Sequence, residues 1–225
     1  MSHGCFISYK KEDKAKGYLK KVVDKLKELG ITCSYLDETI ESDNIDTVIS
    51  ILRQNYMNNK PVTIFLIGGN SFEDTKENWD KTYGHFVKHD EYNEQSYIIR
   101  ELRATLSDYD GSPRHGVLGV VLPEMINRIY KGTYKCDHCG ETIRYVHLDD
   151  DVVIREFWKN YYLLPENDEC NHYNENGRYC VMCTLEEFLA NPNKYIDKAY
   201  EKTKSKIAQS VHYKDIEHDY KLRDE

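Results

Sequence analysis

Short apolar segments alternate with amphipathic helical segments through the first 125 residues, and this alternation constrains the fold more than any other feature. The strongest apolar segment, "PVTIFLIGG" at residues 61–69, could be buried on both faces, which is typical of a strand inside a parallel sheet. Three weaker strand-like segments are "GCFISY" at 4–9, "ITCSYL" at 31–36 and "GVLGVVLP" at 116–123. Segments with helical periodicity separate them, at 13–30, 44–59 and 93–106. The pattern predicts an α/β protein with a doubly wound parallel sheet.

Ligands of doubly wound sheets bind beyond the carboxyl ends of the strands. The loops after Tyr9, Leu36 and Gly68 are therefore where functional residues are expected. The chain has neither the dinucleotide fingerprint GxGxxG nor the phosphate-binding motif GxxxxGK[ST], since "IGGN" is too short for both. Rossmann-type dinucleotide binding and P-loop chemistry are thereby set aside.

Charge and composition remove several classes of protein. The net charge is −8, and Lys and Arg are scattered, so no basic patch predicts nucleic-acid binding. No segment approaches the roughly 20 apolar residues that span a bilayer, and the N-terminus passes into charge without a signal-peptide core. The seven cysteines are an odd number and five of them cluster, which does not suggest a disulfide framework. We expect a cytoplasmic, reduced protein without a membrane partner.

Residues 124–184 break the alternation and contain two cysteine pairs, "CDHC" (Cys136, Cys139) and "CVMC" (Cys180, Cys183). Two such pairs can complete a tetrahedral zinc site, and four protein ligands leave no open position for catalysis. The 40 residues between the pairs exceed the usual spacing, so the intervening segment must loop out. Free buried cysteines and a redox pair are the alternatives. Four spare ligands could replace a thiolate: His138, His147, Cys170 and His172.

The segment "NEQSYIIRELRATL" at 93–106 predicts an amphipathic helix with Glu101 beside its apolar stripe. The stripe comprises Ile98, Ile99, Leu102 and Leu106. Tyr97 lies one turn before Glu101, so the ring and the carboxylate are neighbours. A helical Glu is most often a solvated surface acid, and pattern alone favours that interpretation.

Four segments, in order, resemble TIR domains, and in particular the bacterial TIR-like family of Thoeris anti-phage defence. "FISYKKED" at 6–13 resembles the opening strand and loop of TIR domains, and "FLIGGNSF" at 65–72 resembles the third strand of the bacterial family. "SYIIRELRAT" at 96–105 resembles the helix in which an aromatic residue precedes the catalytic glutamate by four positions. "GVLGVVLP" takes the place of the next strand. The resemblance covers residues 4–123 and the last helix.

The resemblance implies a flavodoxin-like fold and an enzyme that breaks the nicotinamide–ribose bond of NAD+. Glu101 takes the role of the catalytic carboxylate, which suits an oxocarbenium-like ribose. Tyr97 stands where the family usually has Trp. The substrate-binding residues implied by position are Phe6, Ser8, Tyr9, Asn70, Ser71 and Tyr97. Other roles remain open for three of them: Phe6 as a core residue, and Asn70 and Ser71 as parts of a turn.

Two elaborations depart from the family pattern. Residues 72–95 form a 24-residue insertion before the catalytic helix, where the family has only a few residues. The cysteine-rich segment at 124–184, stapled by zinc, is the second. A C-terminal helix at 185–208 completes a single TIR-like domain over 1–225, with Thr184 as N-cap and Glu187 closing a capping box.

The leading functional hypothesis is an NAD+-cleaving enzyme that makes a cyclic or conjugated ADP-ribose signal during phage infection. The chain has no second effector domain, so the hypothesis implies a separate nucleotide-sensing effector protein, a phage-derived activator and assembly into a homo-oligomer. A non-enzymatic TIR adaptor is the main alternative, and it would not require a carboxylate at position 101. A nucleoside deoxyribosyltransferase-like enzyme is the third hypothesis, although "FISYKKED" has no obvious place in it.

Overall fold

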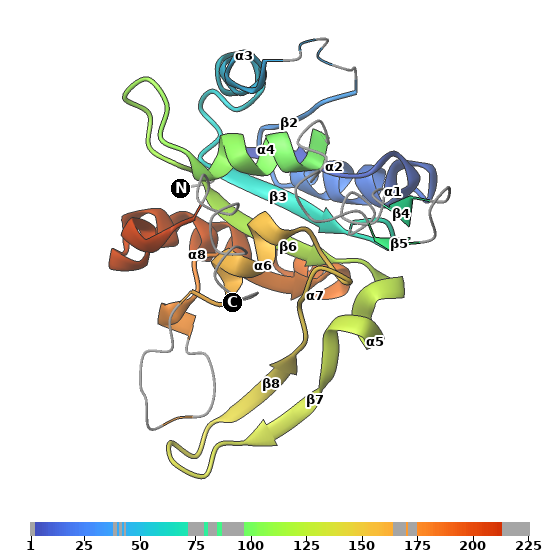
Figure 1. Cartoon of the computed structure of the whole chain (residues 1–225), viewed down its shortest axis with the longest axis vertical. Helices are drawn as coiled ribbons and strands as arrows, with labels where there is room; N and C mark the ends of the chain where they lie inside the picture. The colour runs from blue at the N-terminus through green and yellow to red at the C-terminus, as the bar shows by residue number, and fades with distance from the viewer. Residues whose placement is uncertain are drawn as a thin grey trace.

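The computed structural model describes residues 3–37, 40, 42, 44–71, 79–80, 85–86, 97–163, 170 and 175–212. Five parallel strands form the central sheet in the order β2-β1-β3-β6-β9 (Figure 1). Their bounds are β1 Cys5–Ser8, β2 Cys33–Tyr35, β3 Val62–Ile67, β6 Gly116–Val121 and β9 Val181–Thr184. The prediction of an α/β protein with a parallel sheet is confirmed, and the four predicted strand segments all enter the sheet.

Helices cover both faces of the sheet, because alternate residues of each strand point to opposite sides. On one face, Val62, Ile64 and Leu66 of β3 join a core cluster with three helices: α2 (Tyr18–Glu28), α7 (Leu185–Ala190) and α8 (Pro192–Lys204). On the other face, Phe65 and Ile67 pack with α4 (Tyr97–Leu106) and α6 (Arg155–Tyr161). On that second face, α3 (Ile45–Ile51) and the π-helical turn η1 (Leu52–Tyr56) cover Phe6 of β1. The short helix α1 (Lys11–Ala15) follows β1.

The segment between β6 and β9 leaves the sheet and returns to its edge. After η4 (Pro123–Met125) and α5 (Ile126–Ile129), the antiparallel strands β7 (Tyr130–Lys135) and β8 (Thr142–Val146) form a hairpin that projects from the molecule (Figure 1). The chain then enters α6 and, further on, η5 (Glu175–Gly177). Of the predicted 72–95 insertion, the structure describes only the antiparallel pair β4 (Trp79–Asp80) and β5 (His85–Phe86).

The fifth strand corrects the sequence analysis, which assigned residues up to 184 to an irregular insertion. Val181–Thr184 pairs with β6 instead, in the register Val120↔Cys183. Asn160 of α6 aligns the chain for this pairing, because its backbone carbonyl accepts the N–H groups of Tyr179 and Cys180 at 3.0 and 3.2 Å. The Asn160 side-chain amide also donates to the His212 carbonyl at 2.9 Å, which fixes the far end of the described chain.

The predicted C-terminal helix at 185–208 is divided into α7, α8 and η6 (Lys206–Ser210). The predicted capping box starts α7, since Thr184 Oγ1 accepts the Glu187 N–H and Glu187 accepts the Thr184 N–H. Asn191 ends α7 and caps α8 by accepting the Lys194 N–H at 3.2 Å, with Pro192 at the first helical position.

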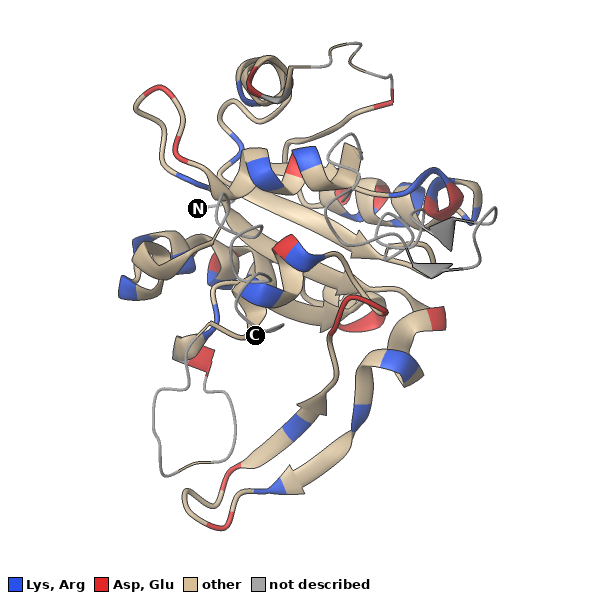
Figure 2. Cartoon of the chain, in the orientation of Figure 1, with Lys and Arg blue, Asp and Glu red and all other residues tan. Residues whose placement is uncertain are grey.

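Charged residues of both signs are interspersed along the elements, and three aspartates gather in the loop at 149–151 (Figure 2). In the described part of the chain, no helix combines the length and the apolar character that crossing a membrane requires.

Gly116 allows α8 to pack directly on the sheet. A Cβ at this position would lie 2.1 Å from the backbone carbonyl oxygen of Ala199, so the helix or the strand would have to move. Gly116→Ala is expected to lower the free energy of unfolding by about 2 kcal/mol, as overpacking of a close contact does. Chemical denaturation of the purified variant and of the natural protein measures this difference in the free energy of unfolding. Gly69→Ala is the matched control, because the nearest atom to its Cβ is 3.9 Å away; equal stability of the two variants would contradict the packing argument.

Candidate functional site

Helix α4 holds Glu101 against the sheet rather than in solvent. The predicted apolar stripe lies in the core with strands β3 and β6, and Glu101 itself is only 5% exposed. Thr105 Oγ1 donates to the Glu101 carbonyl at 2.8 Å and also lies 2.9 Å from Thr63 Oγ1 of β3. This buried pair of threonines fixes the helical turn that carries Glu101. The interpretation of Glu101 as a solvated surface acid is therefore wrong.

The Glu101 carboxyl group meets the carboxyl end of β1. Ser8, the last residue of β1, donates its hydroxyl to Glu101 Oε2 at 2.6 Å, and both side chains are buried. Burial raises the pKa of Glu101 to about 8, and the Ser8 hydrogen bond opposes part of that rise. Among the described residues, no cation lies within ion-pair distance of Glu101. The site thus holds a carboxyl group that titrates near neutral pH.

Tyr9 extends the site toward the loop after β2. Its hydroxyl donates to Asp37 Oδ1 at 2.7 Å and lies 3.2 Å from the Leu36 carbonyl, and Lys14 Nζ lies 2.5 Å from Asp37. The hydrogen bonds from Lys14 and then Tyr9 lower the pKa of Asp37. Burial, then the hydrogen bond to Asp37, raises the pKa of Tyr9, and the charge of Glu101 adds to this rise. The structure therefore brings Ser8 into contact with Glu101 and places Tyr9 close enough for the Glu101 charge to affect its hydroxyl.

Asp13 is a second buried acid near the carboxyl end of β1. It is the third residue of α1, where it accepts the Lys10 N–H at 3.3 Å, and Lys10 is the residue that precedes the helix. Burial raises the pKa of Asp13 to about 6. Its carboxylate fills the space beside Gly68, where an added Cβ would lie 2.1 Å from Asp13 Oδ1. Gly68 directly follows the observed strand β3, and a glycine at this place is the sequence signal for such a close approach.

Four other predicted residues have structural roles or lie at the margin of the site. Phe6 is fully buried among α3, η1 and Ala104, so its assignment to substrate is corrected to a core residue. Ser71 closes a turn by accepting the Gly68 N–H at 2.8 Å, and Asn70 is half-buried in the same turn. Tyr97 is half-buried in the first turn of α4, one turn before Glu101.

A second candidate site lies at the tip of the β7–β8 hairpin. The sulfur atoms of Cys136, Cys139 and Cys170 all lie within 4.8 Å of one another, so the three could hold a metal ion. The Cys136 N–H donates to the Glu141 carbonyl and the Gly140 N–H donates to the Cys136 carbonyl, each at 2.8 Å, in a tight turn. The backbone N–H of Cys139, followed by that of His138, lowers the pKa of Cys136 to about 7. The turn favours the thiolate form that metals bind.

Cys180 and Cys183 do not belong to this cluster, which corrects the predicted ligand set. Cys180 is buried with the α4 and α6 face of the sheet, whereas Cys183 of β9 is buried with the α2, α7 and α8 face. Residues three apart in an extended chain point to opposite sides, so the spacing of "CVMC" cannot form a knuckle here. Cys170, one of the spare ligands, supplies the third sulfur. His172 lies outside the described residues.

Neither a comparison with known family models nor one with curated proteins gives a match for this chain.

Titration of Glu101 predicts a pH-dependent stability. The folded state keeps this proton up to about pH 8, whereas the unfolded chain releases it near the ordinary value of 4.5. Stability therefore falls as pH rises through that window, by at most about 1.4 kcal/mol per pH unit. Glu101→Gln, which carries no charge, should gain stability over the natural protein between about pH 5 and pH 8.

Thermal unfolding across this pH range measures the difference. Glu12→Gln, at an exposed position of α1, is the control and should track the natural protein at every pH. A Glu101→Gln variant whose advantage does not grow with pH would show that Glu101 ionises normally.

Proposed function

We propose that this protein is a TIR-like enzyme that cleaves the nicotinamide–ribose bond of NAD+ and produces an ADP-ribose-derived signal in anti-phage defence. The observation that carries the proposal is the buried contact between Ser8 and Glu101 at the carboxyl end of β1. We also assign the sheet to the flavodoxin-like class, because its five strands follow the order 2-1-3-4-5 along the chain.

The burial of Glu101 supports an enzyme over an adaptor. An unpaired buried carboxyl group costs stability, and a raised pKa beside a strand end is typical of catalytic acids. An adaptor that binds its partners through surface loops would gain nothing from a buried carboxyl group with a raised pKa. By contrast, the buried Glu156 pairs with Arg103 at 3.0 Å, as a structural carboxylate does.

The chemistry needs one carboxylate and little else. The bond between ribose C1′ and the nicotinamide nitrogen breaks, and its electron pair leaves with neutral nicotinamide. The ionised Glu101 stabilises the positive charge that develops on the ribose, in a dry setting where the interaction is strong. Water, or a hydroxyl of a second group, then attacks C1′ and loses its proton to solvent. Ser8 keeps the Glu101 carboxylate in place, and Tyr9 lines the approach from the loop after β2.

The signalling role implies partners outside this chain. We propose a cytoplasmic enzyme that is switched on by a phage-derived activator, assembles into a homo-oligomer and passes its nucleotide product to a separate sensing effector.

We further propose that Cys136, Cys139 and Cys170 bind a structural zinc ion. Three sulfur atoms within tetrahedral reach and a turn that stabilises thiolate match the donor set zinc prefers. A structural site takes four protein ligands, and His172, two residues after Cys170, is the proposed fourth. The ion would join the hairpin tip to the segment that leads into η5.

The enzyme proposal predicts nicotinamide release from NAD+ that rises with pH, with a midpoint near 8, as Glu101 loses its proton. Glu101→Gln should reduce turnover at least about 100-fold, because the variant cannot carry the negative charge. Chromatography of the products after incubation of the purified protein, assembled with its activator or by crowding, measures both effects.

Ser8→Ala provides the internal comparison. The hydroxyl donated to Glu101 favours the ionised form, so its loss should move the midpoint to higher pH while leaving activity at alkaline pH. Undiminished release by Glu101→Gln would refute the assignment of this residue, and a midpoint unmoved in Ser8→Ala would refute the role of Ser8.

The zinc proposal predicts about one zinc ion per chain in elemental analysis. Cys136→Ser and Cys170→Ser should lose the ion, because each removes one of the three clustered sulfur atoms. Cys180→Ser and Cys183→Ser are the matched controls and should keep it, since both thiols lie in the core away from the hairpin tip. Zinc lost from a control and kept in Cys170→Ser would restore the ligand set predicted from the sequence.

A further inference from the structure

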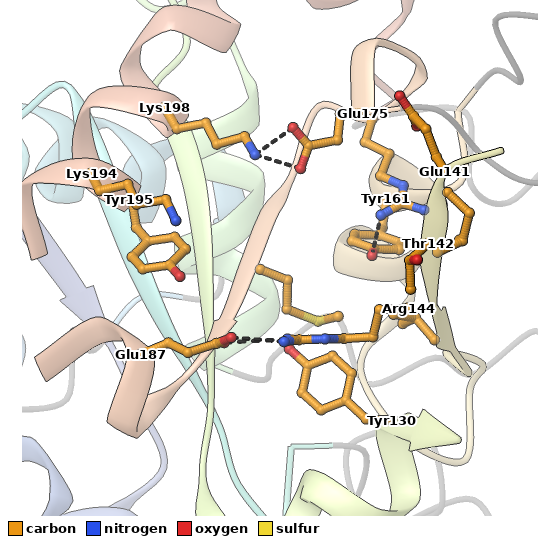
Figure 3. Close-up of a pocket in the computed structure, with 14 residues that line it drawn as sticks. Tyr130, Glu141, Thr142, Arg144, Tyr161, Glu175, Glu187, Lys194, Tyr195 and Lys198 are labelled. Atoms are coloured by element: carbon orange, nitrogen blue, oxygen red, sulfur yellow. Dashed lines mark hydrogen bonds and ion pairs between the residues drawn. The ribbon is translucent and has the colours of Figure 1, made fainter. Parts of the chain in front are cut away.

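A cavity of about 690 Å³ lies between the β7–β8 hairpin and the helices α7 and α8 (Figure 3), and neither Ser8 nor Glu101 lines it. Its hairpin wall is formed by residues of β7 and β8, and its opposite wall by α7, α8 and the outer edge of β9. The volume is in the range of sites that hold ligands of nucleotide size.

Ion pairs cross the cavity at two places. Arg144 of β8 lies 2.8 Å from Glu187 of α7, and Lys198 of α8 pairs with Glu175 of η5 (Figure 3). The Arg144 hydrogen bond is the main cause that lowers the pKa of Glu187 to about 2. The Glu187 carboxylate is therefore charged at neutral pH, and the two ion pairs join elements on opposite sides of the cavity.

Lys194 supplies a cation that these pairs do not use. It lies in the first turn of α8, where the helix dipole adds positive potential, and its ammonium lies 5.1 Å from the centre of the Tyr195 ring. In the described part of the chain, no carboxylate lies within ion-pair distance of it. The residues that line the cavity include four cationic side chains and three carboxylates. Two of the carboxylates, Glu175 and Glu187, are already in ion pairs.

Tyr195 of α8 is a half-buried aromatic ring of the cavity (Figure 3). Tyr161 of α6, on the other wall, is only 3% exposed, with its hydroxyl accepting from Arg178 at 2.6 Å and the guanidinium 4.5 Å from its ring centre. A planar ring can stack on tyrosine or on a guanidinium, and neutral tyrosine tolerates many bases.

We propose that this cavity is a second ligand site that binds a nucleotide with its phosphates on Lys194 and its base against Tyr195. Arg144 is not assigned to the ligand, because its guanidinium already forms two hydrogen bonds with the Glu187 carboxylate, at 2.8 and 3.3 Å. The site uses none of the residues assigned to NAD+ cleavage, so it is independent of that proposal.

Calorimetric titration with ADP, adenosine and pyrophosphate tests the site. ADP should bind, and both fragments should bind at least about tenfold more weakly, because each makes only part of the contacts. Lys194→Gln, at an exposed position, should weaken ADP binding about fivefold or more. Lys204→Gln is the control, since this lysine lies near the other end of α8 and pairs with Glu201 at 3.0 Å.

Two further measurements locate the ligand. ADP should bind equally well to Glu101→Gln, and Lys194→Gln should release nicotinamide at the natural rate. Photolabelling with 8-azido-ADP should modify the peptide that contains Tyr195. The proposal is overturned if ADP does not bind, if Lys194→Gln binds it normally, if pyrophosphate binds as tightly as ADP, or if the label falls elsewhere.

Discussion

Parallel pairing of all five strands is the constraint on which the rest of the structure depends. Each strand needs a crossover that returns the chain to the same end of the sheet, and these crossovers place helices on both faces. The carboxyl ends of the strands therefore share one edge. Ser8, Gly68 with its neighbour Asp13, and the turn of α4 that carries Glu101 lie at this edge. Topology, rather than a local motif, unites Ser8 and Glu101 across 93 positions.

The same edge concentrates carboxyl groups that burial keeps from ionising normally. Asp13 has one backbone N–H donor and Glu101 has one hydroxyl donor, which is less than a buried carboxylate needs. Elsewhere in the core, Glu156 is balanced by a guanidinium. The buried carboxylate with a structural role, Glu156, is thus neutralised by an arginine. Asp13 and Glu101, which lie where ligands of such sheets bind, each have only one hydrogen-bond donor among the described residues.

Much of the fold could be predicted because the spacing of apolar residues, every second position in a strand and three to four positions apart in a helix, indicates which face is buried. The stripe on α4 and the capping box at Thr184 are local features and follow from spacing alone. Strand β9 was missed because the spacing of Cys180 and Cys183 indicated a metal knuckle rather than a strand. The site was partly predictable. Ser8 and Glu101 followed from the family resemblance, but their contact depends on long-range packing that no local sequence pattern reports. The same holds for the position of Cys170 beside Cys136 and Cys139.

The late position of β9 has a consequence for how the molecule is made. Residues 122–180 separate it from β6, its neighbour in the sheet, so the edge of β6 has no partner until most of the chain has left the ribosome. During that interval an apolar strand edge is open to other chains. Closing so long a loop is slowed by entropy, and a metal that joins positions 136 and 170 would shorten it. The cysteine cluster would then serve assembly of the sheet while the chain is still being synthesised.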